Sequence, residues 1–226
     1  MRIGMIGTGR MGRILAERMA TVHEVVLYDA DPAVAQSIAS SMGVGMAESL
    51  AKLDVEAVVL AVPDDAVETC VKALRAAEKR LPLFNVATNI SREMLASFDG
   101  SQGCCLNVKI IGHAGEMSRG ARPILVVDGS GFGLGEMACR IFAPVGDVVV
   151  GEADKVKQIN CIATEAALKA GVALEQSLQR AGVSDVQMIR AALSLVATGV
   201  LRAYAEDDLG PFARGIVKAL RDKSDG

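Results

Sequence analysis

The stretch IGMIGTGRMG, Ile3 to Gly12, places three glycines in the spacing G-x-G-x-x-G directly after a short apolar run. Alone, this spacing is a weak signal, because a chain with 23 glycines in 226 residues produces loose matches by chance. Its surroundings give it meaning. Arg2–Ile6 is typical of a short buried strand, and the apolar spacing from Met11 to Met19 indicates a helix. The glycines therefore lie at a strand-to-helix turn.

The same alternation of strand-like and helix-like segments continues through the first half of the chain. Asp31 and Pro32 are typical of a helix start, the first as N-cap and the second in the opening turn. The strands lack polar alternation, which predicts a parallel sheet covered on both faces. We expect a doubly wound, Rossmann-type α/β fold with a mostly parallel sheet. The expected strands after the first are Glu24–Tyr28, Val55–Val62, Leu83–Thr88, Cys104–Ile111, Pro123–Asp128 and Asp147–Val150, and the expected helices are Pro32–Ser41, Asp64–Lys79 and one capped by Ser91.

After Gly151 the pattern becomes helical throughout. Glu152–Arg180 contains no proline and carries apolar residues at helical spacing, which predicts one long helix. Ser184 is the expected cap of a second helix that reaches Ala205, and Pro211 opens a last one that ends near Arg221. We therefore predict a nucleotide-binding α/β domain over 1–151 and a small all-α domain over 152–226.

Composition narrows the function classes. The formal net charge is −3, with 24 basic and 27 acidic residues, and the chain has only seven aromatic residues and no tryptophan. This balance argues against nucleic-acid binding. The five cysteines have no metal-ligand spacing, so we expect reduced thiols and no metal site. Without signal-peptide features or an uncharged apolar run of membrane length, the chain is expected to be cytoplasmic and not a membrane protein.

The glycine turn predicts a dinucleotide site, because it joins a strand to a helix at the head of a βαβ unit. Gly7 would permit the tight turn, Gly9 would let the backbone approach a pyrophosphate, and Gly12 would let the helix pack closely on the sheet. The helix N-terminus would then direct its N–H groups at the phosphates. The alternative is a plain glycine turn. The expected loop contacts are Gly7, Thr8, Gly9, Arg10, Met11 and Gly12.

Asp29 is the residue expected to choose the coenzyme. It ends the second strand, where a carboxylate can accept from both ribose hydroxyls of NAD and would repel the 2′-phosphate of NADP. We therefore predict NAD, with NADP less favoured, although Asp29 could also be a turn former. Val62, Pro63 and Thr88 end two further strands and are expected to border the cofactor. Asn85 and Asn89 are further candidates there, with a turn role as the alternative.

His113 and Lys157 are the candidates for acid–base chemistry. His113 follows the apolar run that ends at Ile111, so a parallel strand would place it in the ligand crevice. Lys157 and Asn160 are three residues apart at the start of the long helix and share one face. A loop histidine without a role and a solvated lysine are the alternatives. Lys109, Arg119 and Arg122 could anchor a substrate carboxylate or could equally be solvated.

Taken together, these motifs resemble the superfamily of β-hydroxyacid and 6-phosphogluconate dehydrogenases, with pyrroline-5-carboxylate reductase and prephenate dehydrogenase as relatives. GTGRMG is similar to the family's G-x-G-x-M-G, AVPDD to its fourth-strand turn, and GEADKVKQIN to its catalytic-lysine segment. The resemblance implies that Lys157 is the proton donor and that Asn160 helps to hold substrate. Ile111, Gly112 and His113 replace the family's Ser-Gly-Gly, and a histidine there resembles the prephenate and hydroxyacyl-CoA branches.

The sequence thus predicts an NAD(P)-dependent oxidoreductase that moves hydride between nicotinamide and a small hydroxy acid, carbonyl or imine, bound between the domains near His113 and Lys157. A pyrroline-5-carboxylate-type reductase and a non-catalytic dinucleotide sensor are the alternatives. The C-terminal helices are rich in alanine and leucine and form too small a domain to bury both faces. We therefore expect a homodimer formed through these helices.

Overall fold

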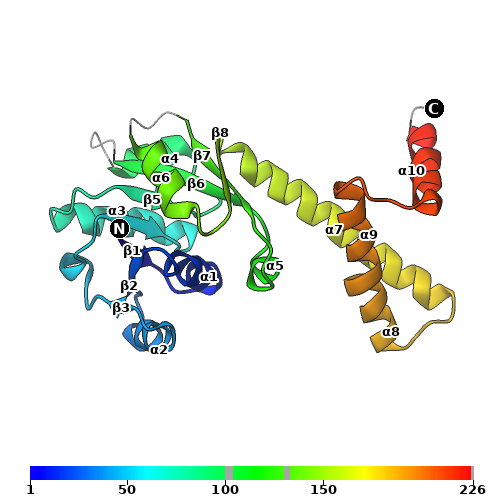
Figure 1. Ribbon diagram of the computed structural model, residues 1–226, viewed down its shortest axis with the longest axis horizontal. Helices are drawn as coiled ribbons and strands as arrows, with labels where there is room; N and C mark the ends of the chain where they lie inside the picture. Colours follow the sequence, from blue (N-terminus) through cyan, green and yellow to red (C-terminus); the bar gives the residue numbers. More distant parts are fainter. Residues whose placement is uncertain (100–103, 130–132, 225–226) are drawn as a thin grey trace. The chain divides into compact units, whose positions relative to one another are not determined.

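The computed structural model describes residues 1–99, 104–129 and 133–224 (Figure 1). The chain divides into two compact units, Met1–Cys161 and Ile162–Gly226, which we call unit 1 and unit 2. Unit 1 contains the sheet with its helices, and unit 2 is helical. The predicted order, α/β first and all-α second, is what the elements show.

Unit 1 is built on an eight-stranded sheet in the order β3-β2-β1-β4-β5-β6-β7-β8. Neighbouring strands are parallel except β6 and β7, so the predicted mostly parallel sheet is confirmed. The strands are β1 (Arg2–Ile6), β2 (Glu24–Tyr28), β3 (Gly45–Met46), β4 (Ala57–Leu60), β5 (Leu83–Asn85), β6 (Cys105–Ile111), β7 (Ile124–Asp128) and β8 (Asp147–Gly151).

Two layers of helices cover the two faces of this sheet (Figure 1). On one face, α1 (Arg10–Met19), α5 (Ala114–Ser118) and α6 (Leu134–Phe142) contribute to a core cluster with alternate strand residues such as Met5. On the other face, α3 (Asp64–Ala76) and α4 (Arg92–Asp99) contribute to a second cluster with residues such as Ile6 and Leu60. Burial on both faces explains why the central strands β1 and β4 show no polar alternation, whereas the edge strand β8 is apolar but mostly exposed.

Two predicted strands are shorter in the structure. The segment predicted as Val55–Val62 pairs only over Ala57–Leu60, and the one predicted as Leu83–Thr88 pairs only over Leu83–Asn85. The apolar runs continue beyond the pairing because Val62 and Ala87 pack in the turns that follow. These turns lie at the carboxyl edge of the sheet, where ligands of such folds bind.

The predicted caps are confirmed for two helices and wrong for one. Asp31 Oδ1 accepts from the N–H groups of Ala33 and Val34 at the start of α2 (Pro32–Met42), and Ser91 Oγ accepts from Met94 at the start of α4. At the start of α8 (Val186–Ala191), however, the cap is Asp185 and not Ser184. A carboxylate one residue later reaches the same free N–H groups.

Unit 2 begins inside α7 (Lys155–Arg180), ten residues beyond the predicted boundary at Gly151. The first turns of α7 belong to unit 1 because Val156 is buried against Val126 and Ala153, and because Asn160 Nδ2 donates to the Ile110 carbonyl at 2.9 Å. The chain then continues through α8, a π-helical segment (Ala192–Ala197), α9 (Thr198–Ala205) and α10 (Pro211–Ser224).

The stretch Val186–Ala205 is apolar as well as helical. Within the described residues it is the one helix long and apolar enough to cross a membrane by length and composition alone, with a mean hydropathy of 1.3. Arg190 and Arg202 interrupt it, and only 6% of it is buried. The sequence prediction considered only uncharged apolar runs of membrane length, so it did not include this stretch with its two arginines.

Candidate functional site

The glycine turn has the geometry that its spacing predicts. Gly7 has a φ of +93°, which favours glycine. A Cβ at Gly12 would lie 2.0 Å from the Gly7 carbonyl oxygen, so only glycine allows α1 to approach β1 this closely. A Cβ at Gly9 would meet nothing within 4 Å, so the space over Gly9 is open.

The N-terminus of α1 fits an anion. The first turn contains no acidic residue, and no side chain among the described residues caps it, which leaves the N–H groups of that turn to a ligand. Arg10 is exposed beside it, Met11 is half-buried, and Thr8 is buried. Open space over Gly9, free donors and no competing carboxylate in that turn are the features a pyrophosphate requires.

Asp29 lies next to this turn at the end of β2. Its Oδ2 accepts from the backbone N–H and the hydroxyl of Thr8, both at 2.7 Å, and its Oδ1 accepts from the N–H of Asp31 at 3.1 Å. Burial raises the pKa of the Asp29 carboxyl, but the hydrogen bonds from Asp31 and Thr8 outweigh it and hold the pKa below its ordinary value. Asp29 is therefore ionised at neutral pH, and it retains lone pairs for further donors.

A cavity of about 590 Å³ opens between the glycine turn and α3. Gly7, Gly9 and Asp29 line one side, and Val62 and Pro63 line another. The other lining residues are mostly apolar: Ile6, Tyr28, Ala30, Leu50, Ala61, Ala66, Thr69, Cys70 and Ala73. An apolar slot with a carboxylate at its rim suits an adenosine, whose base is flat and whose ribose presents two hydroxyls.

The turn after β5 holds Thr88 at the carboxyl edge of the sheet. Thr88 is exposed and does not line the 590 Å³ cavity, which ends on the β4 side at Val62 and Pro63. Asn89 donates to Asp64 from both its backbone and its side chain, at 3.1 and 2.7 Å. Asn85 is fully buried and bonds to Asn107, so the prediction that Asn85 could reach a ligand is wrong. Its side chain serves the turn instead.

His113 lies at the carboxyl end of β6, which is parallel to β5 as the prediction required. The residue is exposed at the N-cap position of α5, and its side chain makes no capping bond. The ring lies over Gly115, where a Cβ would be 3.0 Å from Cε1 of the imidazole. His113 therefore remains a candidate acid–base residue, and it lies at the carboxyl edge of the sheet, as predicted.

Lys157 and Asn160 occupy the first turns of α7, within unit 1. Lys157 is exposed, and it makes no hydrogen bond or ion pair in the part of the chain that the structure describes. The Asn160 amide already donates to the Ile110 carbonyl, so it ties α7 to β6. This contact brings the start of α7 next to the end of the strand that precedes His113.

Lys109 is the residue whose surroundings differ most from expectation. The sequence predicted either an anchor for a substrate carboxylate or a solvated lysine. The second alternative is wrong, because Lys109 on β6 is only 2% exposed. Arg119 and Arg122 are instead exposed and form surface ion pairs with Glu116 and Asp147. The sequence shows Lys109 as a polar interruption of an apolar strand, but that interruption alone does not tell whether the ammonium is buried.

Comparison with known proteins agrees with this geometry. Residues 2–87 match the family model described as NADP oxidoreductase coenzyme F420-dependent. No protein of curated function matches the sequence. The fold is similar to a pyrroline-5-carboxylate reductase from Coxiella burnetii, with a TM-score of 0.73, 15% identity, and coverage of 96% of this chain and 84% of that one.

Two further solved structures share the fold. An imine reductase variant from Myxococcus stipitatus in complex with NAD+ has a TM-score of 0.66 and 16% identity, over 91% of this chain and 77% of that one. A 3-hydroxyisobutyrate dehydrogenase from Mycobacterium tuberculosis has a TM-score of 0.64 and 21% identity, over 81% and 66%. This chain has the fold of the NAD(P)-binding Rossmann oxidoreductase superfamily. The resemblance stated from GTGRMG, AVPDD and GEADKVKQIN is thereby confirmed at the level of fold.

The glycine turn makes a paired prediction. Gly12→Ala is expected to lower the free energy of unfolding by about 3 kcal/mol or more, because the new methyl would overlap the Gly7 carbonyl. Gly9→Ala is expected to change it by no more than about 1 kcal/mol, since the added Cβ meets open space. Urea unfolding of both variants measures the difference, and equal losses would contradict this account of the turn.

Proposed function

We propose that this chain is an NAD-dependent oxidoreductase. The observation that carries the proposal is the Asp29 carboxylate, held ionised beside the glycine turn at the mouth of the 590 Å³ cavity. The adenosine would occupy that cavity, and the pyrophosphate would lie over Gly9 against the N-terminus of α1. Val62 and Pro63 would then guide the dinucleotide toward Thr88. The bound nicotinamide supplies or accepts a hydride.

The choice of NAD over NADP follows from charge. Asp29 carries a full negative charge at neutral pH, and Asp31 adds a second carboxylate two residues later. No arginine or lysine stands at positions 28–34 to bind a 2′-phosphate. The family model is named for NADP and the imine reductase was solved with NAD+, so these relatives support either coenzyme. The carboxylate at position 29 is the feature that supports NAD.

Asp29→Ala tests the coenzyme site directly. We expect the Kd for NADH to rise by about 10- to 100-fold, the equivalent of a lost hydrogen bond to a charged group, while the Kd for NADPH changes less. Titration by nicotinamide fluorescence gives both constants. Glu24→Ala, at the opposite end of β2, is the matched control and should bind like the wild type. A wild type that binds neither nucleotide would refute the proposed function.

The substrate class that we propose is a small carbonyl, imine or hydroxy acid. The solved structures that cover most of this chain include a pyrroline-5-carboxylate reductase and an imine reductase, and they favour a carbon–nitrogen double bond. The 3-hydroxyisobutyrate dehydrogenase shares the fold over a smaller part of the chain. A pyrroline-5-carboxylate-type reductase is therefore the second candidate. A non-catalytic sensor would bind dinucleotide but turn over no substrate.

Lys157 is the proposed proton donor, with Asn160 positioning the start of α7. The exposed ammonium of Lys157 is not engaged by another described residue, so it can donate to a substrate oxygen or nitrogen. Lys157→Ala is expected to lower kcat by about 10²- to 10⁴-fold with little change in dinucleotide affinity. Lys155→Ala, which removes a lysine already paired with Glu152, is the control. A loss confined to His113→Ala would assign the proton transfer to His113 instead.

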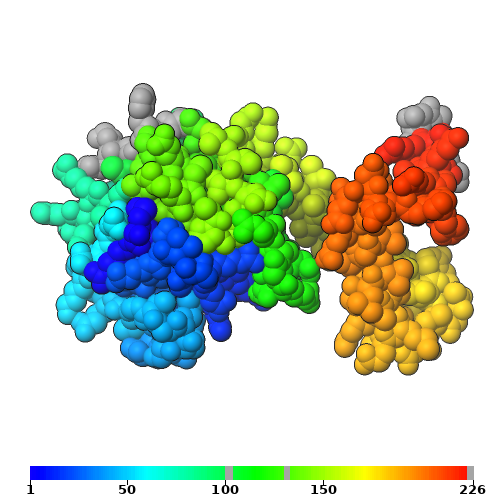
Figure 2. All heavy atoms as spheres, in the orientation of Figure 1, coloured from blue at the N-terminus to red at the C-terminus, as the bar shows by residue number. Residues whose placement is uncertain are grey.

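We also propose that the chain acts as a homodimer assembled through unit 2. Among the described side chains of this unit, Ile189 is the one buried hydrophobic residue, whereas Leu195 is 71% exposed and Phe212 is 84% exposed. The helices that carry them are drawn in yellow, orange and red in Figure 2. One buried apolar residue is too few to hold a helical domain together. We therefore expect a second copy of the chain to cover the exposed apolar side chains.

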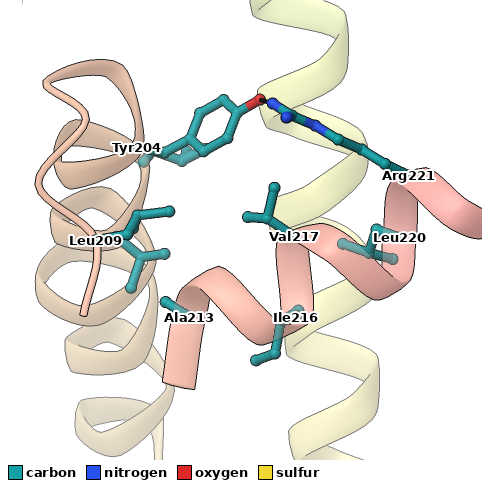
Figure 3. Close-up of a pocket in the computed structure, with 9 residues that line it drawn as sticks. Tyr204, Leu209, Ala213, Ile216, Val217, Leu220 and Arg221 are labelled. Carbon is teal, nitrogen blue, oxygen red and sulfur yellow. Dashed lines mark hydrogen bonds between the residues drawn. The ribbon is translucent and has the colours of Figure 1, made fainter. Parts of the chain in front are cut away.

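A groove between α9 and α10 is part of this apolar surface. It has a volume of about 380 Å³ (Figure 3). Leu209 and Val217 face one another across it, and Arg221 donates to the Tyr204 hydroxyl at 3.1 Å at one end. The remaining lining residues are Val200, Leu201, Ala213, Ile216 and Leu220. The membrane-length stretch Val186–Ala205 contributes to the same groove, which supports a protein interface as the cover of its apolar side chains.

Sedimentation should show twice the chain mass of 23.6 kDa for the wild type. Leu201→Asp is expected to raise the dimer dissociation constant by at least about 100-fold, because a charge would be buried in the interface. Val22→Asp places the same charge on an exposed apolar residue of unit 1 and should leave the dimer intact. A monomeric wild type would refute the proposed dimer.

We propose a cytoplasmic location on the basis of the cysteines. All five cysteines lie in the described part of the chain, and none of them forms a disulfide. Cys70 and Cys105 are partly buried, and burial raises the pKa of both thiols, which keeps them protonated. Reduced, unreactive thiols fit a reducing compartment.

A further inference from the structure

A row of polar side chains is buried on the face of the sheet that α3 and α4 cover. Asn85 on β5 pairs with Asn107 on β6, and its Nδ2 donates to the Asn107 Oδ1 at 2.8 Å. Asp128 ends the neighbouring β7, and Lys109 lies two residues after Asn107 on the same face of β6. These four residues are between 0% and 7% exposed, although most strand residues on this face are apolar.

The Lys109 ammonium is held at one point. Its Nζ donates to the carbonyl oxygen of Ala87, and no carboxylate among the described residues lies within 4.0 Å of it. Asp64, Asp128 and Asp154 act on it from a longer distance. Burial of an ammonium is unfavourable, and an apolar side chain of similar length would stabilise this position more. Core packing therefore does not explain a lysine here.

The residue that Lys109 holds is one end of the turn that presents Thr88. The Ala87 N–H donates to Asn85 Oδ1 at 3.1 Å, and its carbonyl accepts from Lys109, so side chains engage both of its polar groups. On the far side of Thr88, Asn89 is fixed by its two hydrogen bonds to Asp64. Thr88 is thus an exposed residue between two anchored neighbours.

The three carboxylates around Lys109 each hold a different turn. Asp64 binds Asn89, Asp128 accepts from the Ala153 N–H at 3.3 Å, and Asp154 accepts from the Arg92 N–H at 3.3 Å. Among the described residues they do not form a group that could hold a metal ion. Lys109 is the buried cation that offsets their charge, at the edge where β5, α4 and α7 meet.

We propose that Lys109 is a positioning residue for the dinucleotide, which it serves by fixing the Ala87 carbonyl and thereby the place of Thr88 at the carboxyl edge. This inference rests on the proposed function, because Thr88 must contact the bound cofactor for its position to be felt.

The charge on Lys109 can be changed by pH. Burial lowers the pKa of Lys109 to about 8, while Asp154, Asp64 and Asp128 oppose that decrease. Arg92, at the start of α4, is a further charge that acts on Asp128 and favours its ionised form. Above this pH the neutral amine is a weaker donor, so the turn should loosen and dinucleotide affinity should fall.

Stability should change in the opposite direction. The folded-state pKa lies below the ordinary value of 10.5, so between about pH 8 and 10.5 the unfolded chain binds more protons than the folded chain. The contribution of Lys109 to the free energy of unfolding therefore increases with pH in this window. If Lys109 had a purely structural role, a rise in pH would not weaken dinucleotide binding and stabilise the fold at the same time.

The experiment is a fluorescence titration of NADH between about pH 7 and pH 9.5, with the wild type, Lys109→Met and Lys109→Arg. The wild-type Kd should rise by about tenfold as the pH passes the Lys109 pKa. Lys109→Met should bind about tenfold more weakly already at pH 7 and show no step. Lys109→Arg stays protonated, so it should retain affinity across the range.

Thermal unfolding over the same range is the second readout. The wild-type Tm should rise relative to that of Lys109→Met as pH increases. A flat wild-type Kd, or a Lys109→Met variant that binds NADH as tightly as the wild type, would overturn the positioning role while leaving the proposed function in place. If the Met variant fails to fold, the wild-type step and its absence in Lys109→Arg decide. A wild type that binds neither NADH nor NADPH at any pH fails the proposed function itself.

Discussion

The close approach of α1 to β1 determines most of what the site can do. The Gly7 carbonyl lies where a side chain at position 12 would have to stand, so the helix can begin only beside the end of the strand. That contact directs the N-terminus of α1 along the carboxyl edge of the sheet. It also places Thr8 within hydrogen-bond distance of Asp29, so the proposed pyrophosphate site and the proposed ribose carboxylate are linked through one short turn.

A carboxylate, Asp29, and an ammonium, Lys109, lie along this edge of the sheet, and neighbouring groups stabilise the charge of each. At the end where we propose that the adenosine binds, hydrogen bonds from the backbone and Thr8 hold the pKa of the Asp29 carboxyl below its ordinary value. At the β5–β6 end, three carboxylates offset a buried ammonium that desolvation would otherwise neutralise more completely. Asp29 and Lys109 each hold a backbone turn at this edge through hydrogen bonds, so the order of these turns depends on the two charges.

The sequence was sufficient for the fold because its main signals are local. Glycine spacing, apolar strand runs, and caps such as Asp31 depend on neighbours a few residues away, and these were predicted correctly. The strand ends were not predicted correctly. Val62 and Ala87 are apolar because they pack in the turns after the strands, and they do not take part in strand pairing. The short helices α5 and α6 lack a periodic run long enough to read, and the unit boundary depends on Val156 reaching Val126, a tertiary contact.

The site was predictable only in part, for a related reason. Gly7 and Gly12 act through backbone geometry that their own segment sets, so their roles in the turn could be predicted from their spacing. The burial of Lys109 depends on helices α4 and α7 arriving from 17 residues before and 46 residues after it, and no local pattern encodes that. Burial of an ammonium disfavours the folded state, and the positioning role that we propose for Lys109 accounts for its presence here. Among the described residues, the hydrogen bond of the Lys109 ammonium leads to the turn that presents Thr88.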